Sequence, residues 1–123
     1  MSGRMIAVDF DGTLCRDCYP KIGEANSRLI RILKELRQNG DQLILWTCRQ
    51  GQALEEALQF CEAWGLTFDA INENLPQITE RYGSDSRKIY ADIYIDDRSI
   101  SPWGWCDGRL RNYFCQVLCH AST

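Results

Sequence analysis

The alternation of short apolar stretches with amphipathic stretches is the feature that most limits the fold of this chain. The amphipathic segments 23–40 and 51–65 carry apolar side chains at helical spacing, and each ends in a glycine. Short apolar runs that read as buried strands precede or follow them, at residues 4–10, 41–47, 66–72 and 91–97. Parallel strands need crossover connections of this length. We therefore expect an α/β fold with a three-layer, doubly wound parallel sheet.

The length of the chain predicts one domain. Its 123 residues, 45% of them hydrophobic, can bury a single core, so we expect one domain over residues 1–123. The segment 74–88 reads as mixed loop and helix, and 107–120 as a closing helix. No apolar run approaches the roughly 18 residues of a membrane helix, and the start of the chain lacks a signal-peptide pattern. We expect a cytoplasmic protein without a membrane partner.

The seven cysteines predict free thiols rather than a disulfide framework, because their number is odd and nothing indicates export. The pairs in "CRDC" and "CQVLC" leave a zinc-stabilised interaction protein as an alternative. The net charge of −3 provides no overall basic surface, so a nucleic-acid partner is possible but not favoured.

Polar side chains follow every predicted strand. Since the carboxyl ends of parallel strands meet at one edge of a sheet, these side chains should gather there. Carboxylates that converge in this way repel one another unless a cation lies among them, and oxygen ligands favour Mg²⁺. The sequence therefore predicts a magnesium site built from the residues after four strands: Asp9 and Asp11; Thr47 and Arg49; Asn72 and Asn74; Asp96, Asp97 and Arg98.

Basic residues near the same strand ends predict that the site binds phosphate. They are Arg16, Arg49, Arg87, Lys88 and Arg98. Two questions stay open from the residues alone. Arg49 and Arg98 can bind a substrate phosphate or pair with the last acids, and Asn72 and Asn74 can contact substrate or form a turn.

The acids of "VDFDGTL" predict acid and nucleophile chemistry. Residues two apart on a strand face the same way, so Asp9 and Asp11 can address one substrate. One carboxylate can attack phosphorus while the other protonates the departing oxygen. Gly12 permits close approach of the backbone. The sequence does not favour the competing chemistries. The one histidine, His120, lies near the end of the chain, which does not suit a catalytic role. No cysteine has an arginine six positions later, as in the loop of cysteine phosphatases, and no GxxxxGK[ST] loop for nucleoside triphosphates occurs.

These residues resemble the motifs of the haloacid dehalogenase superfamily. "DFDGTL", Thr47 at the end of "LILWT", Lys88 and the "DD" of "YIDD" occur in the order of that superfamily. A response-regulator receiver has similar residues, but its acidic pair comes early in the chain. The resemblance implies a magnesium-dependent phosphohydrolase that forms an aspartyl-phosphate.

The resemblance also implies a role for each matching residue. Asp9 would be the nucleophile, and Asp11 would act as acid and then as base. Mg²⁺ would be held by Asp9, the carbonyl of Asp11 and either Asp97 or Asp96, with the other acid further out. Thr47 and Lys88, or Arg87 in place of Lys88, would hold the phosphoryl group. Further phosphate contacts are expected from Gly12, Thr13, Arg49 and Arg98.

The spacing of the motifs leaves no room for a full cap domain. The segment 13–41 can hold one helix, and 47–88 one helix, one strand and a loop. An open site suits a phosphate on a large molecule, or a small substrate covered by a second subunit of a homo-oligomer. The chain is similar to small capless bacterial and phage proteins of the superfamily. "IDDR" also resembles the phosphatase half of polynucleotide kinase phosphatases, so a polynucleotide phosphatase is one alternative; a catalytically silent metal- and phosphate-binding module is the other.

Overall fold

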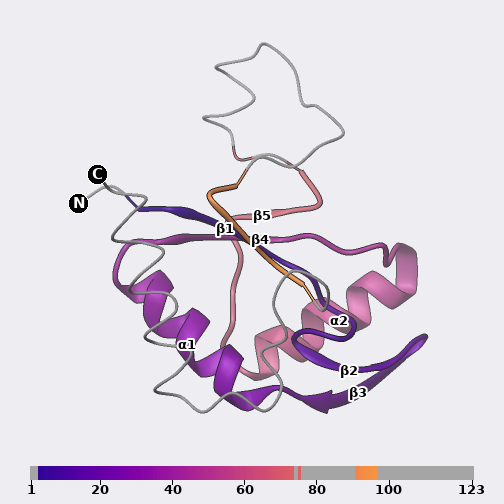
Figure 1. The fold of residues 1–123 in the computed structure, drawn as a ribbon. Helices are drawn as coiled ribbons and strands as arrows, with labels where there is room; N and C mark the ends of the chain where they lie inside the picture. The colour runs from indigo at the N-terminus through magenta and orange to yellow at the C-terminus, as the bar shows by residue number, and fades with distance from the viewer. Residues whose placement is uncertain (1–2, 74, 76–90, 97–123) are drawn as a thin grey trace.

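The computed structural model describes residues 3–73, 75 and 91–96. Outside these residues lie several of the predicted features, namely Asn74, Arg87, Lys88, Asp97, Arg98, the closing helix over 107–120 and the cysteines of "CQVLC". The described elements in chain order are β1 (Met5–Val8), β2 (Cys15–Cys18), β3 (Lys21–Ala25), α1 (Ser27–Gln38), β4 (Gln42–Leu45), α2 (Gly51–Ala63), β5 (Ala70–Ile71) and β6 (Ile93–Ile95) (Figure 1).

Four of the strands form a parallel sheet in the order β5-β4-β1-β6. Strand β1 lies inside the sheet, where Ile6 pairs with Leu43 of β4 on one side and with Ile93 of β6 on the other. The chain moves from β1 through β4 to β5 in one direction and then returns to the far side of β1. The expected α/β fold with a parallel sheet is therefore confirmed.

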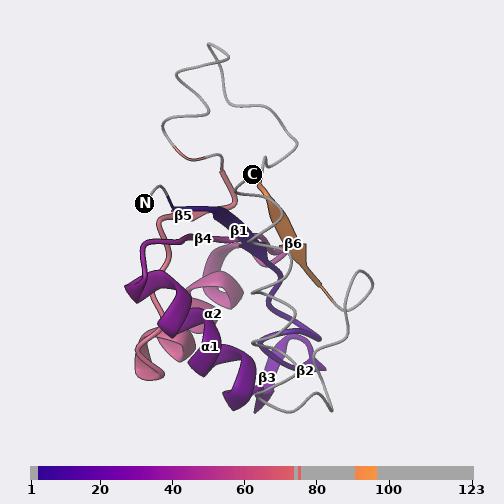
Figure 2. The same ribbon diagram turned by 60° about the vertical axis from the view of Figure 1, so that its left-hand side comes forward.

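The main core lies between the sheet and both described helices. Helix α1 contributes Leu29 and Leu33, and α2 contributes Ala57 and Cys61, all of them buried against apolar side chains of β1, β4 and β6. Figure 2 shows the two helices on the same side of the sheet. Gly40 and Gly65, with φ of 106° and 74°, follow the helices as the sequence predicts.

The other face of the sheet carries a smaller apolar cluster. Ala7, Ile44 and Ala70 are buried there with Leu75 and Ala91. In the part of the chain that the structure describes, no helix covers this face, so the described residues show two layers and leave the expected third layer untested. None of the described helices has the length and apolar character needed to cross a membrane.

Two features differ from the sequence prediction. The third strand was expected over 66–72 but is limited to Ala70–Ile71, paired with Ile44 and Leu45. The antiparallel hairpin of β2 and β3 was not predicted, and it follows β1 directly, before α1. Strand β2 is mostly exposed, and β3 combines exposed charged residues with half-buried ones, so neither has the regular apolar alternation from which strands are recognised.

Candidate active site

A cavity of about 410 Å³ lies at the carboxyl ends of three neighbouring strands. Ligands in open α/β sheets bind in this position, where the chain leaves a central strand in opposite directions. Here that strand is β1, between β4 and β6. The cavity is lined by Asp9, Asp11, Asp17, Trp46, Thr47, Cys48 and Asp96.

Backbone hydrogen bonds hold the three strand ends together. The Asp9 N–H donates to the carbonyl of Ile95 at 2.9 Å, and the Trp46 N–H donates to the carbonyl of Val8 at 2.9 Å. The residues directly after β1, β4 and β6 therefore meet at one edge. As expected, the structure brings Asp9, Asp11, Thr47 and Asp96 to the same cavity.

The loop after β1 turns sharply and sets the two acids in different surroundings. One carboxylate oxygen of Asp9 accepts a hydrogen bond from the Phe10 N–H at 2.7 Å. Two residues later, Gly12 has a φ of 84°, a conformation that side chains disfavour, and its N–H donates to the carbonyl of Cys15 at 2.9 Å. Glycine is thus needed where the loop bends back toward the hairpin.

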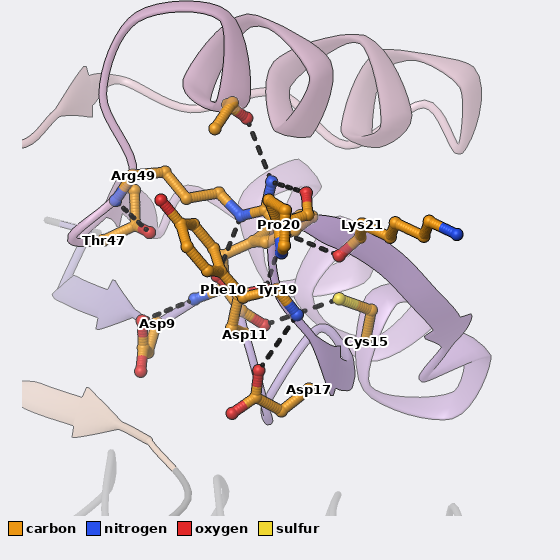
Figure 3. A network of polar contacts seen from close by, with 11 residues as sticks. Asp9, Phe10, Asp11, Cys15, Asp17, Tyr19, Pro20, Lys21, Thr47 and Arg49 are labelled. Carbon is orange, nitrogen blue, oxygen red and sulfur yellow. Dashed lines mark hydrogen bonds and ion pairs between the residues drawn. The ribbon is translucent and has the colours of Figure 1, made fainter.

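Arg49 forms a two-pronged ion pair with Asp11. Its Nε and one terminal nitrogen (Nη2) donate to the two Asp11 oxygens, each at 2.8 Å (Figure 3). The Arg49 side chain is fully buried, whereas that of Asp11 is 19% exposed. The hydrogen bond to Asp11 raises the pKa of the Arg49 guanidinium above its usual value.

This position differs from the one predicted for Arg49. The sequence placed it on a substrate phosphate or against the last acids, but its partner is the second acid of the first motif. Phe10 and Tyr19 also lie against it, with ring centroids 5.0 and 5.1 Å from the guanidinium carbon. A buried guanidinium that is enclosed in this way is not presented to a ligand in the cavity.

Thr47 lies at the cavity with its backbone and its side chain both engaged. Its N–H donates to Oδ1 of Asn72 at 2.7 Å, and its hydroxyl oxygen accepts from the Arg49 N–H at 3.2 Å. Asn72 has a φ of 55°, which asparagine tolerates in turns. Of the two roles left open for Asn72, the geometry supports the turn, because this residue does not line the cavity.

Thr13 lies in the protein interior rather than at the cavity. Its side chain is fully buried, and its hydroxyl contacts no hydrogen-bond partner among the described residues. Neither Gly12 nor Thr13 is among the residues that line the cavity. The predicted phosphate contact of Thr13 therefore has no support from the geometry.

Three residues of the cavity wall were not predicted. Asp17 comes from β2, and Trp46 and Cys48 flank Thr47. Trp46 is 41% exposed and packs edge-on against Tyr94, with ring centroids 5.8 Å apart. Because Trp46 and Cys48 are next to Thr47 in the sequence, their place at the cavity could have been predicted. No feature of the sequence predicted Asp17 there, because it reaches the cavity only through the hairpin.

The described cysteines are free thiols. Cys15 and Cys61 are buried, and burial raises the pKa of both thiols, that of Cys61 to about 12. Cys18 and Cys48 are exposed. Within residues 3–73, 75 and 91–96, no three His, Cys, Asp or Glu side chains are grouped to hold a metal ion.

No protein-family model matches this chain, and no curated protein matches it. A similar solved structure is that of a conserved protein from Bacteroides thetaiotaomicron, with a TM-score of 0.76 and 40% sequence identity. The match covers 94% of this chain and 91% of the other. Identity at this level over nearly all of both chains reflects more than a shared fold, and the chain belongs to the same family as this Bacteroides thetaiotaomicron protein.

Proposed function

We propose that this protein is a phosphohydrolase of the haloacid dehalogenase type that cleaves phosphate monoesters through an aspartyl-phosphate. The observation that carries the proposal is that Asp9, Asp11, Thr47 and Asp96 line the same cavity. These residues follow three different strands, and they are four of the residues that the motifs assign to this chemistry; Lys88 and Asp97 lie outside the described residues. The spacing of the motifs in the sequence leaves no room for a full cap domain, which suits an open site.

In the first step, an Asp9 carboxylate oxygen attacks phosphorus and the bond from phosphorus to the ester oxygen breaks. Asp11 gives a proton to that departing oxygen, which leaves as an alcohol. In the second step, Asp11 takes a proton from water as the water oxygen attacks the aspartyl-phosphate. Asp9 is released as a carboxylate together with inorganic phosphate. The hydroxyl of Thr47 donates a hydrogen bond to a phosphoryl oxygen.

The cavity offers carboxylate oxygens, which are the ligands that Mg²⁺ prefers, although no three acidic side chains of the described residues are grouped closely enough to hold a metal ion by themselves. Asp9, the backbone carbonyl of Asp11 and Asp96 or Asp97 would hold the ion. Bound there, Mg²⁺ would neutralise part of the negative charge of the phosphoryl group.

Hydrolysis of p-nitrophenyl phosphate tests the proposal. We expect release of p-nitrophenol that needs Mg²⁺, stops on addition of a chelator, and is lost in Asp9→Asn. Glu55→Gln is the matched control, because it removes an exposed acid of α2 that does not line the cavity. Folded, magnesium-loaded protein that releases no phosphate from this ester or from a panel of phosphorylated metabolites and nucleic-acid ends contradicts the proposal and favours a silent binding module.

A further inference from the structure

We propose that Arg49 is a positioning residue, which holds the Asp11 carboxylate and the turn of the β2–β3 hairpin in one fixed arrangement beside the cavity. The inference rests on the proposed function, since it assigns to Arg49 the placement of the group that transfers the proton. It differs from a phosphate-binding role, in which Arg49 would contact the substrate itself.

The hydrogen bonds of Arg49 carry this inference. A guanidinium has five N–H donors, and here each has an acceptor. Two donate to the Asp11 oxygens, as described above. The other three donate to backbone carbonyls: Pro20 and Ala53 at 3.2 Å and Lys21 at 3.0 Å. No donor is left for a substrate phosphate.

These acceptors belong to three separate parts of the fold. Asp11 follows β1, Pro20 lies in the turn of the hairpin directly before Lys21, the first residue of β3, and Ala53 lies in the first turn of α2. Figure 3 shows the guanidinium between the hairpin turn and Asp11. Because both Asp11 oxygens are held by one planar group, the carboxylate has a defined orientation at the cavity wall. The hairpin that carries Asp17 to the cavity is held by the same group.

Lysine cannot replace this arrangement. Its ammonium keeps the charge but has three donors on a single atom, so it cannot hold two carboxylate oxygens and three carbonyls. Arg49→Lys should therefore preserve the local charge and release the orientation of Asp11. Arg37→Lys is the matched control, because Arg37 makes a similar two-pronged pair with Asp69, at 3.0 and 3.4 Å, that is exposed and does not line the cavity.

The experiment compares kcat/KM for two esters, because this constant reports the steps through departure of the leaving group. Nitrophenolate leaves without a proton, whereas the alkoxide of glycerol 2-phosphate needs one. We expect Arg49→Lys to lower kcat/KM about 10- to 100-fold for glycerol 2-phosphate and less than about threefold for p-nitrophenyl phosphate. Arg37→Lys should change neither by more than about twofold.

Equal losses on both esters would overturn the inference, since loss of a phosphate contact or of the fold affects the two alike. A rise in KM with unchanged kcat would also overturn it. If the unmodified protein cleaves neither of these esters and none of the panel of phosphorylated metabolites and nucleic-acid ends, the proposed function fails instead.

A second measurement needs neither activity nor a folded Arg49→Lys variant. By NMR, the Nε–H of Arg49 in the unmodified protein should exchange with solvent much more slowly than the Nε–H of exposed arginines, and Asp11→Asn should accelerate its exchange. Rapid exchange in the unmodified protein would show that the pair with Asp11 does not persist, and would overturn the inference.

Discussion

The two aspartates of the first motif lie in different immediate surroundings. Asp9 contacts the backbone N–H of the next residue, whereas Asp11 is held at both oxygens by a buried guanidinium. Both line the same cavity. The two acids of one motif are therefore distinguished by their contacts rather than by residue type.

Thr47 provides a test at this scale. Thr47→Val should lower kcat/KM for p-nitrophenyl phosphate about 100- to 1,000-fold, because it removes a hydroxyl donor to the phosphoryl group. Thr47→Ser should keep most of the activity. The Thr47 hydroxyl also accepts a hydrogen bond from the Arg49 N–H, at 3.2 Å. Thermal unfolding of both variants measures whether a change in this bond destabilises the protein. A Val variant that is folded and fully active would contradict the role assigned to Thr47.

The residues themselves predicted Asp9, Asp11, Thr47 and Asp96 at one site, because their positions after strands are visible in the sequence. The partner of Arg49 was not predictable in this way. Asp11 and Arg49 are 38 positions apart, and several acids were equally available to Arg49 from the sequence. Only the path of the hairpin and the start of α2 select Asp11.

At the scale of elements, the first turn of α1 is connected to the loop that follows β1. Asn26, which is 6% exposed, accepts a hydrogen bond from the Leu29 N–H at 3.3 Å. Its side-chain amide also donates to the carbonyl of Thr13 at 3.2 Å. One side chain thus caps the helix and secures the loop that follows β1.

Asn26→Ala should lower the free energy of unfolding by about 1–2 kcal/mol, since it removes the cap and a buried hydrogen bond. Urea denaturation measures the change. Asn39→Ala, at the exposed opposite end of α1, is the control and should change the free energy by less than about 0.5 kcal/mol. Equal effects of the two substitutions would argue against a special role for Asn26.

At the scale of the whole molecule, negative charge is concentrated at one edge of the sheet. Asp9, Asp11, Asp17 and Asp96 all line the cavity. Among the described residues, Arg49 is a cation that contacts one of them, Asp11. A divalent cation that binds to carboxylates of the folded cavity would stabilise the folded state, because it binds that state in preference to the unfolded chain.

Mg²⁺ should therefore raise the Tm of the protein. At a concentration about 100 times its Kd, binding to the folded state adds about 2.7 kcal/mol to the free energy of unfolding. Thermal unfolding with MgCl₂, compared with KCl at the same ionic strength, measures the effect, and Asp9→Asn should reduce it. A Tm that does not respond to Mg²⁺, or that responds equally in Asp9→Asn, would contradict a magnesium site at Asp9.

The sequence by itself determined the parallel sheet, the two helices with their glycine ends, and the gathering of acids and a threonine at the carboxyl ends of the strands. These features depend on local periodicity and on the direction of parallel strands, both of which are written in short stretches of residues. The tertiary structure alone decided the β2–β3 hairpin, the entry of Asp17 into the cavity wall and the pairing of Arg49 with Asp11. The hairpin is local, but its strands lack the apolar alternation from which strands are recognised. The pair of Arg49 and Asp11 depends on a contact between segments that are distant in the chain, and only the packed elements bring those segments together.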